Sequence, residues 1–84
     1  MFKAIVTITF KKSILDPQGS AVQNALTPLG YSEVEEVRMG KHIEILLRGD
    51  KRQEAVERVR EMCARLLANP VIEDYQVELL EVEA

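Results

Sequence analysis

The sequence predicts an α+β domain in which two helices cover one face of a four-stranded antiparallel sheet. Three observations support this class. Apolar and polar residues alternate in several short runs, and two other segments carry apolar residues at helical spacing. The order of these segments is strand, helix, strand, strand, helix, strand. With right-handed crossovers, this order gives the ferredoxin-like βαββαβ two-layer arrangement.

Length and composition define the class of protein further. A chain of 84 residues allows one domain, residues 1–84, and its single cysteine and single histidine exclude an internal disulfide and a multi-histidine metal site. A formal charge of −3 argues against a nucleic-acid partner. No apolar run is long enough for a signal peptide or a membrane span. We therefore expect a cytoplasmic protein with no membrane partner.

The first half of the chain predicts a strand and a helix. Residues 2–10 alternate with a period of two, which indicates a strand with one face in the core. Asp16 supplies a helix N-cap, and Pro17 suits the first helical position, where no N–H is needed. Gly30 is placed to end this helix, and Pro28 predicts that its last turn is kinked or unwound. The apolar stripe of the helix consists of Val22, Ala25, Leu26 and Leu29.

The second half predicts a hairpin, a helix and a last strand. Residues 33–39 are interpreted as a strand with a bulge, Gly40-Lys41 as a turn, and residues 43–47 as the partner strand. Asp50 and Gln53 resemble a capping box at the start of the second helix. Asn69 and Pro70 end that helix, and residues 71–82 alternate as the final strand.

The sheet face opposite the helices has nothing from this chain to cover it. Alternation gives this face several apolar side chains among charged ones, and their burial would matter to the stability of so small a fold. We therefore predict a homodimer or homotetramer that self-associates through this face. The residues expected to make the contact are Ile5, Thr7, Leu46, Leu80 and Val82.

The sequence offers no group of residues typical of catalysis. Its glycines form neither a dinucleotide fingerprint nor a P-loop, and Ser20 lacks the flanking glycines of a nucleophile elbow. Cys63 lies on the apolar stripe of the second helix, and His42 is expected to be an exposed strand residue. The acidic pairs fit a solvated surface. We therefore expect no catalytic, cofactor-binding or metal-binding residue in this chain.

Two segments suggest contact with a partner. The first is the start of the first helix, which has a glycine in a turn whose backbone N–H groups can bind an anion. The second is the predicted hairpin tip, which carries two cations. Capping and turn chemistry alone is the simpler explanation of both segments. The residues concerned are Asp16, Gln18, Gly19, Arg38, Gly40 and Lys41.

Four segments together resemble one known family along essentially the whole chain. They are LDPQG at 15–19, LGY at 29–31, VRMGK at 37–41 and LLANPVIEDY at 66–75. In this combination they are similar to PurS, the small subunit of phosphoribosylformylglycinamidine (FGAM) synthase. Pro70 departs from the polar residue expected there, which affects only the start of the last strand.

The resemblance implies a role in de novo purine synthesis, in the conversion of formylglycinamide ribonucleotide to its amidine with glutamine and ATP. In this family the synthetase and the glutaminase are separate chains, and the small subunit assembles them for ammonia transfer without being a catalyst. ATP and Mg²⁺ are then expected on the synthetase, not on this chain. The two segments described above would contact the large subunits.

Two other readings stay open. An acylphosphatase-like small enzyme would share the fold but needs a phosphate-cradling loop with an arginine after the first strand. The basic residues at positions 11–15 are lysines only. A ligand-sensing regulatory dimer is the second alternative.

Overall fold

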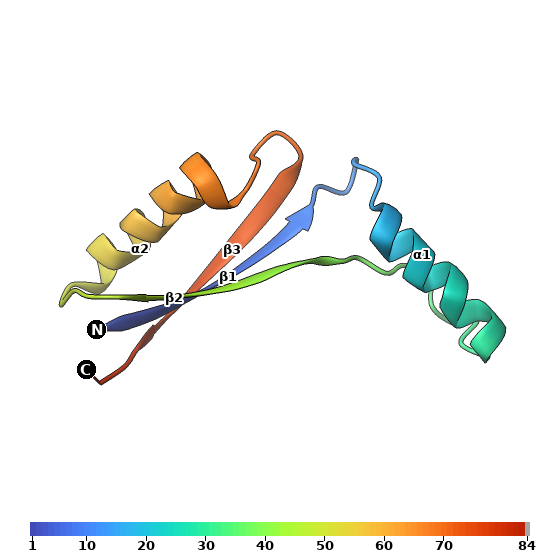
Figure 1. Ribbon diagram of the computed structural model, residues 1–84, viewed down its shortest axis with the longest axis horizontal. Helices are drawn as coiled ribbons and strands as arrows, with labels where there is room; N and C mark the ends of the chain where they lie inside the picture. The colour runs from blue at the N-terminus through green and yellow to red at the C-terminus, as the bar shows by residue number, and fades with distance from the viewer. Residues whose placement is uncertain (84) are drawn as a thin grey trace.

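The structure is a computed structural model that describes residues 1–83, and it confirms the α+β class (Figure 1). The elements are β1 (Phe2–Phe10), α1 (Pro17–Leu26) with a 3₁₀ turn (Thr27–Leu29), β2 (Gly40–Leu47), α2 (Arg52–Met62) with a π turn (Cys63–Leu67), and β3 (Glu73–Glu81). The three strands are antiparallel and form one sheet in the order β2-β1-β3.

The central strand β1 sets which side chains share a face. The register places Val6 opposite Ile43 of β2 and Val77 of β3, so these three side chains lie on the same face. This covered face contains the core, because Phe2, Ala4, Val6 and Ile8 are all buried. The alternation that the sequence predicted for residues 2–10 is confirmed with the same bounds.

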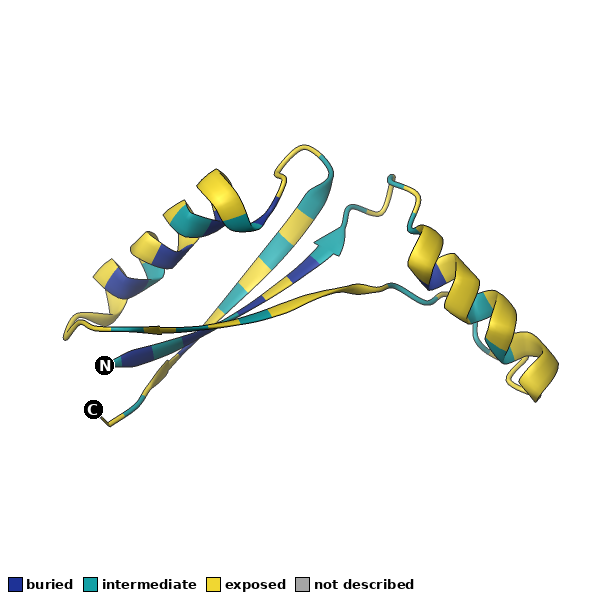
Figure 2. Cartoon of the chain, in the orientation of Figure 1, coloured by how far each residue is buried: buried dark blue, intermediate teal, exposed yellow. Residues whose placement is uncertain are grey.

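Helix α2 lies across the covered face over β1 and β3. Its inner side buries Ala55, Val59 and Cys63 against the strands. Figure 2 shows this buried side facing the sheet and an exposed side facing away. Arg52 fixes the helix to the last strand, since its Nη2 donates a hydrogen bond to the Leu79 carbonyl at 2.6 Å.

The predicted capping box at Asp50 is wrong. The helix N-cap is Lys51, whose backbone is extended and whose side chain makes no capping hydrogen bond. The side chain that caps a helix belongs to the N-cap residue itself. Asp50 stands one residue before that position and so cannot cap α2 in this way. The other predicted helix terminus is confirmed: Asp16 caps α1, Pro17 is its first residue, and Gly30 ends the 3₁₀ turn with φ of 102°.

The predicted hairpin at Gly40-Lys41 is also wrong. A two-residue hairpin turn requires positive φ, and among residues 1–83 only Gly30 has it. Gly40 instead begins β2 and pairs with Thr9 in an extended conformation. A Cβ on Gly40 would lie 2.2 Å from the Ile8 carbonyl oxygen, so glycine allows the close approach of the two strands here. Residues 34–39 therefore lead straight into β2 without a turn, and they form no strand of this sheet.

The four-stranded sheet with two helices on one face is not what the described residues form. Residues 11–39, which we call the arm, project from the sheet, and α1 stands clear of it (Figure 1). The molecule measures 50 × 28 × 14 Å, and its radius of gyration is 16.3 Å. A compact chain of this length would have about 12 Å. Because the chain does not turn back at Gly40, the arm is carried away from the face that α1 was expected to cover.

Candidate functional site

The root of the arm is held by the carboxylate of Asp16. Its Oδ1 accepts a hydrogen bond from the Gly19 backbone N–H at 2.9 Å, which caps α1. Its Oδ2 accepts a second bond from the Met39 backbone N–H at 2.8 Å. One side chain thus joins the start of the helix to the end of the extended segment that precedes β2.

Helix α1 lies along residues 34–39 within the arm. Gln23 Nε2 donates a hydrogen bond to the Glu35 carbonyl at 2.9 Å. Gly19, the buried residue of α1, comes so close that an added Cβ would lie 2.1 Å from the Val37 carbonyl oxygen. These contacts use the side of α1 that carries Gly19, Gln23 and Leu26, and they make the arm a closely packed helix-and-segment unit.

The electrostatics at the root follow from this geometry. The hydrogen bond from Gly19, then that from Met39, lower the pKa of Asp16 below its ordinary value of 3.8, and the nearby Arg38 acts in the same direction. A cleft of about 400 Å³ opens beside the carboxylate, with Lys12, Glu36 and Arg38 among its lining residues. Apolar side chains, Ile14, Leu15 and Val37, line the same cleft, so its surface combines apolar groups with charges of both signs.

The structure brings the two suspected partner segments together. Asp16 and Gly19 lie next to the Arg38–Met39 end of the second segment, although about twenty positions separate them in sequence. Gln18 and Lys41 are both exposed. Gly40 does not stand at a hairpin tip, because it pairs within the sheet.

The uncovered sheet face carries the predicted side chains. Pairing of Lys3 with both Leu46 and Leu80 confirms the expected alternation, and the two leucines are 65% and 41% exposed. By the same register Ile5 and Thr7 share this face, and Val82 follows at the end of β3.

Charge is interleaved with these apolar groups. Lys3 forms an ion pair with Glu44, and His42 Nε2 lies 3.3 Å from the other oxygen of the same carboxylate. The hydrogen bond from Lys3, followed by that from His42, lowers the pKa of Glu44. The open face is therefore a mixed surface of the kind found in non-obligate interfaces.

Side chains of the kinds that bind metal ions do not cluster in residues 1–83. No cluster of three or more His, Cys, Asp or Glu side chains there could hold a metal ion. The thiol of Cys63 is buried in the core, and that burial raises its pKa. In the same range, no helix has the length and apolar character needed to cross a bilayer.

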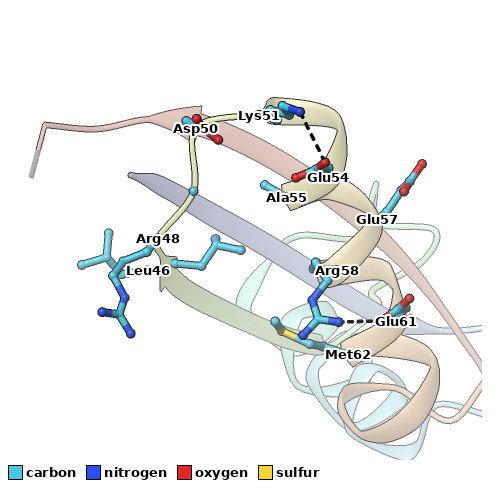
Figure 3. A pocket seen from close by; sticks show the side chains of 12 residues that line it. Leu46, Arg48, Asp50, Lys51, Glu54, Ala55, Glu57, Arg58, Glu61 and Met62 are labelled. Carbon is cyan, nitrogen blue, oxygen red and sulfur yellow. Dashed lines mark hydrogen bonds and ion pairs between the residues drawn. The ribbon is translucent and has the colours of Figure 1, made fainter.

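A larger cleft lies along α2, and sequence reasoning missed it. It has a volume of about 640 Å³ and runs between the end of β2 and the side of α2 (Figure 3). Apolar groups of Leu47, Ala55 and Met62 line it, and an ion pair between Arg58 and Glu61 at 3.5 Å lies on its helix side. The cleft exists because α2 covers β1 and β3 but not the edge strand β2.

The chain matches one protein family over nearly its whole length. The profile of PurS, phosphoribosylformylglycinamidine (FGAM) synthase, aligns with residues 3–81. The chain is 51% identical over 84 residues to the PurS subunit of FGAM synthase of Bacillus subtilis, covering 100% of this chain and 99% of that protein. This chain belongs to the PurS family.

Solved structures of the family agree with the shape of the molecule. The crystal structure of Methanocaldococcus jannaschii PurS superposes with a TM-score of 0.88 at 43% identity, covering 99% of this chain and 100% of that one. The two chains therefore share one fold along nearly their whole length.

The family also has a member solved in a larger assembly. A chain in the structure of PurLQS from Thermotoga maritima matches at 30% identity with a TM-score of 0.85, covering 94% of this chain and 96% of that chain. The PurS resemblance that the sequence motifs suggested is thus confirmed.

Proposed function

We propose that this chain is the non-catalytic small subunit of FGAM synthase, and that it holds the synthetase and glutaminase subunits together for ammonia transfer. The observation that carries the proposal is the full-length similarity to PurS subunits, including the PurS-like chain found in PurLQS.

The role of such a subunit is positional. Ammonia released by a glutaminase is lost to bulk water unless the receiving active site is held nearby, so fixing the two sites raises its effective concentration. ATP and Mg²⁺ belong on the synthetase in this scheme, and this chain needs no cofactor of its own. The cytoplasm, where purine synthesis supplies nucleotides, is the compartment in which it would act.

The root of the arm is the surface proposed for the large subunits. Asp16 and Gly19 meet the Arg38–Met39 end of the second segment there, beside a cleft of mixed polar and apolar lining. Gln18 lies next to Gly19 in α1, and Lys41 follows on β2. Gln18→Ala and Lys41→Glu change exposed side chains only, so they test the contact without disturbing the fold. Gly40→Trp would not be a clean test, because any side chain there meets the Ile8 carbonyl.

The open sheet face is the surface proposed for self-association into a homodimer or homotetramer. Its exposed leucines, Leu46 and Leu80, stand among Ile5, Thr7 and Val82. Leu46 is 65% and Leu80 41% exposed, so covering what remains of the two contributes roughly 1.5–3 kcal/mol together, which is a large share of the stability of a small domain.

The decisive experiment is reconstitution. Purified synthetase and glutaminase are mixed with and without this chain, and glutamine-dependent amidine formation is measured, with free ammonia as an alternative nitrogen source. We expect the chain to be required for the glutamine-dependent reaction and to have little effect on the ammonia-dependent one. Equal glutamine-dependent rates with and without it would contradict the proposal.

A further inference from the structure

The single histidine of the chain lies on the open sheet face. The register places His42 in one row with Thr7 of β1 and Gln76 of β3, and its side chain is 61% exposed. Its sequence neighbours Lys41 and Ile43 take the opposite face by alternation. Histidine is the side chain whose ordinary titration falls between pH 5 and 8. His42 is therefore the side chain through which this face can change its charge near neutral pH.

The imidazole of His42 lies beside a carboxylate that is held ionised. Its Nε2 is 3.3 Å from Oε2 of Glu44, two residues further along β2 on the same face. Lys3 pairs with the other oxygen of this carboxylate. The hydrogen bond from Lys3, followed by that from His42, lowers the pKa of Glu44. The carboxylate of Glu44 thus stays charged throughout the range in which histidine titrates.

Acidic groups from two strands surround His42. Its row and the two adjacent rows of the open face carry no Lys or Arg, and they carry the carboxylates of Glu44, Glu78 and Asp74. Lys3 stands one row further on. Helix α2 packs on the other face, and α1 stands clear of the sheet (Figure 1), so among residues 1–83 the strands alone supply the charges near His42. We call these three rows the acidic half of the open face.

The apolar half of the same face is the part that gains most from being covered by a second copy. Leu46 and Leu80 flank Lys3 there and are 65% and 41% exposed. The whole chain exposes 6436 Å², whereas a compact monomer of 9.5 kDa exposes about 5,000 Å². The excess is larger than the ~800 Å² that each partner contributes to a standard interface. Leu46 and His42 are about 14 Å apart along β2, so an interface of that size extends over the acidic half.

We propose that protonation of His42 controls self-association through the open face. This inference rests on the homodimer or homotetramer proposed above. A free chain surrounds His42 with its own three carboxylates, and an isologous pair adds the acidic half of the second copy. The two acidic halves repel each other while both histidines are neutral, and a proton on each offsets part of the repulsion. Contact with Glu44 keeps the imidazolium paired when the face is covered.

The sign of the effect follows from proton linkage. Paired copies surround His42 with more negative charge than a free chain does, so pairing favours the protonated form and takes up protons. The dissociation constant therefore falls as the pH falls through the range in which histidine titrates. A gain of about threefold in proton affinity at each of the two histidines lowers the dissociation constant about tenfold between pH 8 and pH 5.5.

Sedimentation equilibrium of the full chain between pH 5.5 and pH 8 measures this constant. Leu80→Ser identifies the association step that uses the open face, because it removes an exposed apolar contact without changing the charge. We expect Leu80→Ser to weaken that step at every pH. In the original chain the same step should tighten about tenfold from pH 8 to pH 5.5 at low salt, and much less in 0.5 M NaCl, since about 0.5 M salt screens exposed charges.

Two substitutions at position 42 separate charge from shape. His42→Gln is neutral at every pH and can still donate a hydrogen bond to Glu44, so its dissociation constant should stay near the pH 8 value of the original chain. His42→Lys is charged throughout this range, so its constant should stay near the original pH 5.5 value. Circular dichroism checks that both variants fold.

The outcomes separate this inference from the proposals on which it rests. A dissociation constant that does not change with pH, or a His42→Gln chain that keeps the full pH dependence, would overturn the role of His42 and leave self-association in place. A Leu80→Ser chain that associates like the original would overturn both. None of these results bears on the proposed role in FGAM synthase, which the reconstitution assay measures separately.

Discussion

Gly19→Ala tests the packing of the arm, because two opposing effects meet at this residue. In an exposed helix the substitution stabilises by about 1 kcal/mol, since glycine is a poor helix former. Here the new Cβ would lie 2.1 Å from the Val37 carbonyl oxygen, well inside the 3.0 Å below which real Cβ atoms essentially never approach other atoms. The obstacle is backbone, so α1 has to move away from residues 34–39.

The balance favours destabilisation. Overpacking of this kind costs about 1–3 kcal/mol, and the shift also strains the Gln23–Glu35 hydrogen bond. After the helix-propensity gain, a net loss of about 1–2 kcal/mol remains. Because the loss is confined to the arm, native-state hydrogen exchange is the suitable assay, and the Met39 amide should exchange about 5–30-fold faster.

Ser20→Ala is the matched control. Ser20 is the next residue of α1 and is exposed, so alanine changes helix propensity there without a clash. We expect no acceleration of Met39 exchange in this variant. A Gly19→Ala protein whose Met39 amide exchanges at the original rate or more slowly would refute the reasoning.

Three further results are expected. The lowered pKa of Asp16 means that its contribution to stability is fully present above about pH 4 and is lost as the pH falls through the folded pKa, so urea titrations of Asp16→Asn and the original chain should differ at pH 7 and converge in acid. Arg52→Ala should lower the free energy of unfolding by about 1–3 kcal/mol, since the part-buried Leu79 carbonyl loses its donor, whereas exposed Arg60→Ala should have little effect. Iodoacetamide should modify Cys63 slowly in the native protein and rapidly in urea, and fast native modification would contradict its burial.

The sequence predicted correctly several structural features that depend only on residues close together in the chain. The bounds of β1, the Asp16 cap and the unwound turn around Pro28 all follow from alternation, side-chain capping and the missing proline N–H. The composition of the open face follows from the period of two, and the family follows from motifs spread along the chain. At Asp50 the same kind of reasoning erred by a single position, since helix boundaries depend on backbone angles that a motif does not specify.

The placement of the arm was not readable in this way. Residues 34–47 carry the same apolar pattern whether they fold into a hairpin or run straight, because alternation reports which face a side chain takes and not which strand lies beside it. The structure decides the matter at Gly40, where extended backbone and close contact with Ile8 replace a turn. The meeting of Asp16 with Met39 depends on the same choice.

The sequence by itself therefore determined the helices, three of the strands, the uncovered sheet face and membership of the PurS family, since each rests on local pattern or on motif order. Only the tertiary structure decided that α1 leaves the sheet, that two distant segments join at the arm root, and that a cleft stays open beside α2. These features depend on contacts between residues far apart in the chain. The pattern of a short sequence segment carries no information about the energies of such contacts.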